Sequence, residues 1–146
     1  MEPTPAATEP VSVPGLQDAL SSLFAPWVQE LRLQVLEASP GEVLLSLPVT
    51  PHHVHVGGVV CGQTLMAAAD TAMVLAVMSR HGGRFRPMTT VQLQTSFLRA
   101  VPAGAGSARV RARVLKMGKS LAFGGIDITG ADGQLAAQAT TTYALL

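Results

Sequence analysis

Apolar residues fill one stretch of the chain almost without interruption. Of the 14 residues from 65 to 78, 12 are apolar, and a helix that is apolar on every side lies inside a protein or a membrane. The stretch is too short to cross a bilayer and carries an acid at its centre. We therefore predict a buried helix from Cys61 to Ser79, stopped by Gly82-Gly83.

Alternation of apolar and polar residues predicts strands on both sides of this helix. In residues 108–114 the apolar side chains alternate with three arginines, a pattern typical of an antiparallel sheet with one packed face and one solvated face. The other predicted elements are a short helix at 16–24, closed by Pro26, and strands at 29–38, 43–47, 88–98, 120–129 and 134–144.

The order of these elements favours one compact arrangement. One flat sheet face cannot cover a helix that is apolar all round, so we expect a curved antiparallel sheet wrapped around it. This α+β arrangement is the hotdog fold. We predict one such domain at residues 16–146, and a disordered tail at 1–15, where four prolines stand among small and polar residues.

Composition narrows the possible partners. Charged residues make up only 13% of the chain, which indicates extra buried surface and so a subunit interface. A net charge of +1 and 4% aromatic residues give no attraction to nucleic acid and few platforms for base stacking. The single cysteine cannot form an intrachain disulfide. Because we find no signal peptide and no membrane span, we expect a cytoplasmic protein.

Asp70 is the only charged residue in the apolar stretch, and we expect it to be wholly buried. A buried carboxylate loses hydration at a cost in free energy unless it is paired or hydrogen-bonded. Asp70 is therefore the first candidate for chemistry. It follows the glycine-containing segment His55-Val-Gly-Gly-Val-Val-Cys-Gly-Gln63.

This segment resembles a motif of the hotdog-fold acyl-CoA thioesterases, in the branch with the phenylacetate-pathway and 4-hydroxybenzoyl-CoA thioesterases. Their pattern is approximately Asn-x-x-Gly-x-x-His-Gly-Gly, followed by an Asp on the central helix. Gly62 and Asp70 match it, whereas His55, Cys61 and Gln63 replace the Asn, the His and the second Gly. The resemblance covers residues 30–146 and includes Thr90-Val-Gln-Leu, Phe97-Leu-Arg-Ala-Val-Pro, Gly118-Lys119 and Asp132-Gly-Gln-Leu-Ala-Ala.

The resemblance implies hydrolysis of an acyl-CoA thioester. This reaction needs a donor for the oxyanion and a group that activates water or attacks directly. We assign the first role to the N–H group of Gly62, in the first turn of the helix, and the second to Asp70, as general base or nucleophile. Thr90 matches the position where the family has a Ser or Thr that holds the acid or the water. A threonine on a half-buried strand face, without a role in the site, explains this residue equally well.

The spacing of the two groups predicts a dimer. Gly62 and Asp70 are eight residues apart, or about 12 Å along a helix, so one carbonyl group cannot contact both. Two helices packed antiparallel about a twofold axis would bring Gly62 of one chain near Asp70 of the other. We therefore expect a homodimer with two sites, which the resemblance also implies, and a dimer of dimers.

The remaining candidates would bind the acyl-CoA, with CoA as part of the substrate and no separate cofactor. His55 is either a hydrogen-bond donor to the thioester or the glycine loop, or a solvated loop residue. Cys61 is either a nucleophile or a small buried filler, and Gln63 shares its motif. Basic residues at turns near the helix ends would meet the phosphates of CoA: Arg84, Arg99 and Lys119.

Other functions stay open. His52, His53 and His55 suggest a metal site, but their loop has no carboxylate or thiolate at ligand spacing other than Cys61, so we expect no metal. The chain could be a non-catalytic acyl or acyl-CoA binding module, in which the His55 and Cys61 replacements no longer support turnover. A hotdog dehydratase or hydratase ranks last, because those enzymes pair a His with an acid in a different loop pattern.

Overall fold

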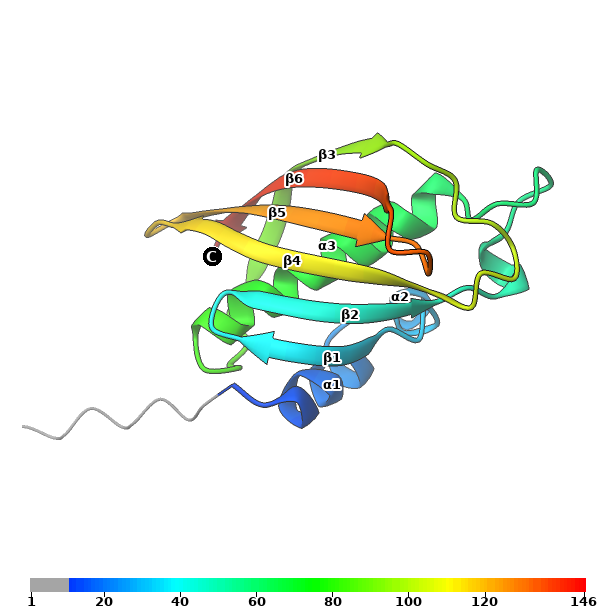
Figure 1. Cartoon of the computed structure of the whole chain (residues 1–146). Helices are drawn as coiled ribbons and strands as arrows, with labels where there is room; N and C mark the ends of the chain where they lie inside the picture. The colour runs from blue at the N-terminus through cyan, green and yellow to red at the C-terminus, as the bar shows by residue number, and fades with distance from the viewer. Residues whose placement is uncertain (1–10) are drawn as a thin grey trace, which may run out of the picture.

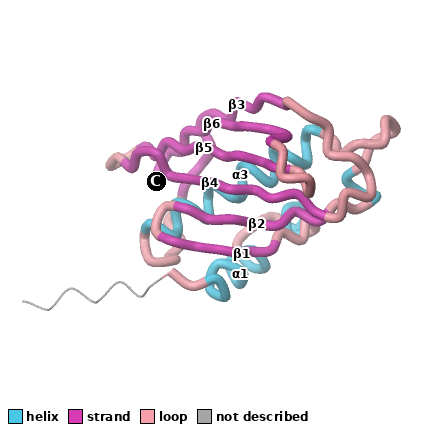
Figure 2. Tube along the Cα trace, in the orientation of Figure 1, coloured by secondary structure: helices cyan, strands magenta, loops and turns pink. Residues whose placement is uncertain are grey.

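The computed structural model describes residues 11–146 as a curved antiparallel sheet with a long helix, α3, across one face (Figure 1). Figure 2 shows the same two layers with the helices and strands in separate colours. The six strands follow the order β1-β2-β4-β5-β6-β3, and the arrangement is the predicted hotdog fold. The elements are α1 (Val13–Ser22), α2 (Pro26–Gln29), β1 (Gln34–Ser39), β2 (Glu42–Pro48), η1 (Pro51–His53), α3 (Gly62–Arg80), β3 (Met88–Phe97), β4 (Ser107–Met117), β5 (Leu121–Thr129) and β6 (Leu135–Leu145).

The core lies between α3 and the sheet. α3 packs mainly on β2, β4 and β5, where Met73 and Val77 of the helix are buried with Leu45 and Ile126 of the sheet. Gly124 of β5 faces Met73, and a Cβ atom at this position would overlap the Met73 sulfur. Glycine therefore allows the sheet to approach the helix closely. None of the helices in residues 11–146 is long and apolar enough to cross a membrane.

The ends of α3 agree with the sequence pattern to within one residue. Cys61 is the N-cap residue, with φ −67° and ψ 149°, and its side chain makes no capping hydrogen bond. At the other end Gly82 and Gly83 have φ of 72° and 85°, the left-handed region that favours glycine. The Gly83 N–H group donates to the Met78 carbonyl oxygen at 2.8 Å, which closes the last turn.

The N-terminal elements differ from the prediction. α1 begins at Val13, inside the segment assigned to the tail, because Ser12 Oγ accepts a hydrogen bond from the Gly15 N–H group at 3.1 Å. Residues 1–10 of the predicted tail lie outside the described residues. Pro26 does not close the first helix but opens α2, since proline at the first helical position has no N–H group to lose.

The first strand is also shorter than predicted. Arg32 has φ 55°, in the left-handed region, so the chain turns there and β1 begins only at Gln34. The alternation that suggested a strand from residue 29 arises because Leu31 and Leu33 are both buried in this turn.

β3 has a neighbour on one side only, because it stands at the end of the sheet. Most of its ten residues are exposed, including Val91 and Phe97, whose exposed fractions are 60% and 50%. A long, exposed edge strand is a surface to which a strand of another chain can pair. The single chain therefore leaves the β3 edge of the sheet open.

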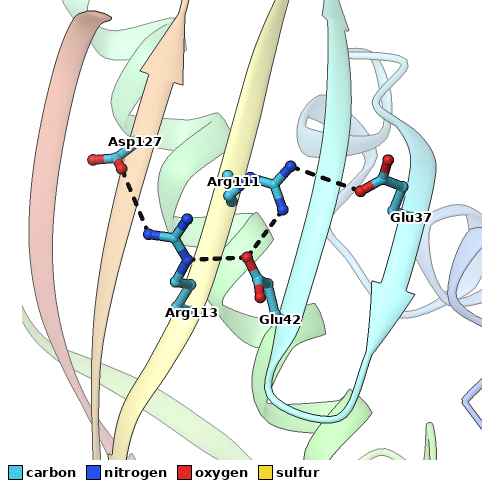
Figure 3. A network of polar contacts seen from close by, with 5 residues as sticks. All are labelled: Glu37, Glu42, Arg111, Arg113 and Asp127. Carbon is cyan, nitrogen blue, oxygen red and sulfur yellow. Dashed lines mark hydrogen bonds and ion pairs between the residues drawn. The ribbon is translucent and has the colours of Figure 1, made fainter.

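Linked ion pairs cover the outer face of the sheet (Figure 3). Glu42 Oε1 accepts hydrogen bonds from Arg111 Nη1 and Arg113 Nε, both at 2.9 Å. Glu37 lies 3.7 Å from Arg111, and Asp127 lies 3.9 Å from Arg113. The hydrogen bond from Arg113, followed by that from Arg111, lowers the pKa of Glu42. The alternating arginines thus form a solvent-facing strand surface with acidic partners on β1, β2 and β5.

Candidate active site

Asp70 lies in the middle of α3, on a stripe that the chain's own sheet leaves partly uncovered. Its side chain is half-buried, as are those of Met66, Ala67 and Val74 at helical spacing on the same stripe. The prediction that Asp70 is wholly buried is therefore wrong for the single chain. The reason is that β2, β4 and β5 pack against the other side of α3, so a second surface is needed to bury this stripe.

Two hydroxyl groups hold the Asp70 carboxylate. Thr90 Oγ1 donates to Asp70 Oδ1 at 2.9 Å, and the Tyr143 hydroxyl donates to the same oxygen. Thr90 on β3 and Tyr143 on β6 are cross-strand partners, so the sheet register places their side chains together beside α3. Within residues 11–146 no group donates to Oδ2, which remains free to accept a proton or to attack.

Tyr143 is a member of the site that the sequence reasoning missed. Burial, followed by the charge of Asp70, raises the pKa of its hydroxyl, so Tyr143 stays protonated and acts as a hydrogen-bond donor. Its hydroxyl also lies 3.0 Å from the main-chain oxygen of Asp70. One signal was available in the sequence. Tyr143 is the only tyrosine of the chain, and a buried tyrosine hydroxyl usually has a polar partner.

The first turn of α3 offers free donors. The Gly62 N–H group makes no hydrogen bond with residues 11–146, as expected for the first residue of a helix. The Phe97 ring lies so close that a Cβ atom at Gly62 would be 3.1 Å from its Cζ atom. Gly62 and Phe97 line a cavity of about 390 Å³ together with Leu98 and Arg99. This end of α3 can therefore bind an anionic or strongly polarised oxygen.

The other residues of the glycine motif surround this turn. Cys61 is half-buried and its Sγ atom lies 3.1 Å from Thr64 Oγ1. Gln63 is exposed and lines a second cavity of about 730 Å³, which Trp27 and His52 also line. Among residues 11–146 no three His, Cys, Asp or Glu side chains are grouped as metal ligands.

His55 is exposed on the loop before α3, and its Nδ1 atom accepts a hydrogen bond from the Gly57 N–H group at 2.8 Å. A neutral imidazole with an acceptor at Nδ1 carries its proton on Nε2. The ring lies so close to Gly57 that a Cβ atom there would be 2.6 Å from His55 Cε1. His55 therefore presents one N–H donor, held in place by its own loop.

The single chain assembles only part of the predicted site. It brings Thr90 to Asp70, but Gly62 lies eight residues away on the same helix, at about 12 Å. Arg99 lies beside Gly62 in the smaller cavity. Arg84 and Lys119 lie instead at the other end of α3, where the Arg84 side chain donates to the main-chain oxygen of His81 and the Arg86 side chain donates to the main-chain oxygen of Lys119.

Known proteins resemble this chain over most of its length. Residues 57–137 match the model of the thioesterase superfamily. Acyl-coenzyme A thioesterase 13 of Homo sapiens is 28% identical over 112 residues, which cover 76% of this chain and 78% of that protein. The crystal structure of zebra fish thioesterase superfamily member 2 has a TM-score of 0.83 at 26% identity and covers 93% of this chain and 99% of that one. A mutant of phenylacetic acid degradation protein PaaI from Thermus thermophilus has a TM-score of 0.74 at 28% identity, covering 84% and 100%.

Proposed function

This chain belongs to the thioesterase superfamily, the enzymes that hydrolyse thioesters, and on that premise we propose that it cleaves an acyl-CoA to the free acid and CoA. Human acyl-coenzyme A thioesterase 13 is 28% identical to this chain over 112 residues, or 76% of the chain, and this similarity supports the substrate class. The observation that carries the proposal is the Asp70 carboxylate, which two hydroxyl groups hold by one oxygen while the other oxygen is free.

The free oxygen of Asp70 suits a general base. It would take a proton from a water molecule as the water oxygen attacks the thioester carbonyl carbon. The N–H group of Gly62 would stabilise the oxyanion that forms. The carbon–sulfur bond then breaks, and CoA leaves as a thiolate that takes up a proton. Direct attack by Asp70 would use the same oxygen and stays an alternative.

The two groups meet only if two chains share a site. We infer a homodimer in which the partly uncovered stripe of α3 packs on its counterpart and the open edges of β3 pair. The exposed apolar side chains of β3 support this pairing. The antiparallel arrangement would bring Gly62 of each chain to Asp70 of the other. Assembly into a dimer of dimers remains a prediction.

Substrate binding would then draw on both chains. Arg99 stands in the cavity beside Gly62 and suits a phosphate of CoA, whereas Arg84 and Lys119 could reach the same CoA only from the second chain. His55 offers its Nε2–H group to the thioester, and Cys61 and Gln63 border the same turn.

Three further statements about this chain also remain predictions. They are a single domain at 16–146, a cytoplasmic location, and a reaction without a separate cofactor.

Release of CoA by wild type and by Asp70→Asn tests the function. With a panel of acyl-CoA substrates, the variant should lose about a hundredfold or more in kcat, because a general base contributes this much. Asp127→Asn, which changes an acid on the outer face, is the matched control and should keep wild-type activity. An inert wild type would favour the binding-module alternative, and an active Asp70→Asn would remove Asp70 from the mechanism.

A further inference from the structure

The strand that carries Thr90 contains one extra residue. Thr90 of β3 pairs with Tyr143 of β6, and the next pair along the two strands is Gln92 with Thr142. Two steps along β3 therefore match one step along β6, so Val91 has no partner of its own. This arrangement is a β-bulge, a feature that often re-aims a side chain beside an active site.

The bulge determines which side chain faces Asp70. Side chains of a strand point alternately to the two faces of the sheet, and in a regular ladder Val91 would stand opposite Tyr143. Thr90 would then point to the outer face, and a valine, which has no donor, would take its place on the inner face. With the bulge Thr90 faces inward, and its hydroxyl lies 2.9 Å from Asp70 Oδ1. The Thr90–Asp70 hydrogen bond therefore depends on the bulge.

A buried hydroxyl group of β6 binds the strand at the bulge. Thr141 Oγ1 donates to the main-chain oxygen of Gln92 at 2.8 Å. Thr141 is 4% exposed, and its partner on β5 is Gly124, which faces Met73 of α3. The Thr141 side chain therefore lies on the inner face, between the sheet and the helix. Because a bulge disrupts the main-chain ladder locally, this side-chain hydrogen bond ties β3 to β6 where the regular pairing is interrupted.

The two threonines beside Thr141 differ from it in burial. Thr140 is exposed and Thr142 is half-buried, because alternate side chains of β6 point away from α3. Tyr143, the next inward residue after Thr141, donates to Asp70. Two successive inward hydroxyl groups of β6 therefore serve the site in different ways. Tyr143 holds the carboxylate, and Thr141 holds the strand that supplies its second donor.

We propose that Thr141 is a positioning residue for thioester hydrolysis, because it holds the bulge that turns Thr90 toward Asp70. This proposal rests on the proposed hydrolysis at Asp70. Thr141 acts through Thr90 and not on the reacting atoms. Without its hydroxyl group, β3 can slip by one residue at Val91, and such a slip exchanges the inner and outer side chains. β3 has a neighbouring strand of its own chain only on the β6 side, so no second strand of the chain opposes the slip.

The test removes the Thr141 hydroxyl group and keeps a side chain of similar shape. Thr141→Val should lower kcat on acyl-CoA by about fivefold to tenfold, the value of one hydrogen bond, with little change in KM. Thr141→Ser keeps a donor and should retain activity. Thr140→Val is the matched control, because it makes the same exchange one residue away at an exposed position, and it should keep wild-type kcat.

A second substitution separates positioning from packing. If Thr141 acts through Thr90, Thr141→Val should have no further effect on kcat in a chain that already carries Thr90→Val. A general loss of packing would lower kcat by the same factor in both chains. Thermal unfolding of each variant measures the loss of stability independently of kcat.

Crystal structures give a measurement that needs no turnover. The hydrogen bond from Thr90 to Asp70 should be broken in Thr141→Val and kept in Thr140→Val. The proposal is overturned if Thr141→Val keeps wild-type kcat, if it lowers kcat equally with and without Thr90, or if the hydrogen bond persists in its crystal structure. An inert wild type would refute the hydrolysis alone, and the two crystal structures would then decide whether Thr141 holds Thr90 in place.

Discussion

Asp70 Oδ1 receives hydrogen bonds from hydroxyl groups of two neighbouring strands, and each hydroxyl has a different chemical task. The raised pKa of Tyr143 means that its hydroxyl keeps its proton over the whole range in which a carboxylate can act as a base. Thr90 lies on the exposed strand β3 and holds the carboxylate from the open side. Because both hydroxyl groups donate to Oδ1, the carboxylate is held in one orientation. This orientation fixes the direction in which the free oxygen, Oδ2, points.

Removing the Tyr143 hydroxyl should impair the chemistry more than substrate binding. We predict that Tyr143→Phe lowers kcat by about tenfold to a hundredfold, the value of one hydrogen bond to a charged group, with little change in KM. Thr90→Val should behave similarly, whereas Thr90→Ser keeps a donor and should retain activity. Steady-state kinetics on acyl-CoA measure this, and wild-type kcat in Tyr143→Phe would mean that the tyrosine serves only packing.

The sequence allowed Thr90 to be placed near Asp70 but not Tyr143. Thr90 stands in a recognisable motif at the start of a strand that follows the helix directly. The position of Tyr143 depends on how β6 pairs with β3, and that register shifts between Thr90 and Gln92. An irregularity of this kind arises from long-range strand pairing, which a local pattern does not contain.

At the scale of elements, the outer-face ion pairs join strands that are distant in sequence. Glu42 on β2 binds two arginines of β4, and these also approach acids of β1 and β5. Because the pKa of Glu42 is below 4.5 in the folded chain, its contribution to stability is present above that pH. The contribution is lost as the pH falls through the lowered value.

Replacing Glu42 should therefore destabilise the fold in a pH-dependent way. We predict that Glu42→Gln lowers the free energy of unfolding at neutral pH by less than about 1 kcal/mol, because the side chain is 35% exposed and solvent screens the pair. The difference from wild type should shrink as the pH falls through the lowered pKa of Glu42, because the carboxylate is then protonated in the folded chain as well. Urea denaturation at neutral pH and along a series of acidic pH values measures it, with the exposed Glu30→Gln as the control. A difference that stays equal at every pH would point to packing instead of charge.

The helices and strands were predictable where a regular pattern of apolar and polar residues continued over many residues. The apolar run gave α3 to within one residue, and the arginine alternation gave the centre of β4. The pattern failed at α2 and at the start of β1, where two buried leucines around Arg32 imitate a strand. A turn with one left-handed residue leaves no periodic signal, so only its contacts define it.

At the scale of the whole molecule, the half-buried state of Asp70 is what a shared site requires. The sequence predicted full burial because it could not separate surface buried within a chain from surface buried between chains. The helical rise, in contrast, already predicted that Gly62 and Asp70 of one chain are too far apart to contact one carbonyl group, which is the basis of the proposed two-chain site. The open β3 edge and the partly uncovered α3 stripe are consistent with that expectation.

Two inactive variants can test the shared site if each damages a different half. Asp70→Asn removes the base, and Gly62→Pro removes the N–H donor. Proline suits the first position of a helix, and Cys61 already has the extended backbone, with ψ 149°, that precedes a proline. Gly62→Ala is the control, because it places the same Cβ atom 3.1 Å from Phe97 but keeps the N–H group.

Each variant alone should lose about a hundredfold in kcat, whereas coexpression of both should restore activity. In a mixed dimer one site combines both defects, and the other combines an intact Asp70 with an intact Gly62. Random pairing makes half of the dimers mixed, so the recovered activity should approach about a quarter of wild type. Tagged chains and light scattering measure how many mixed dimers form. If mixed dimers form without recovery, base and donor act within one chain, and the antiparallel pairing of α3 cannot be the arrangement that builds the site.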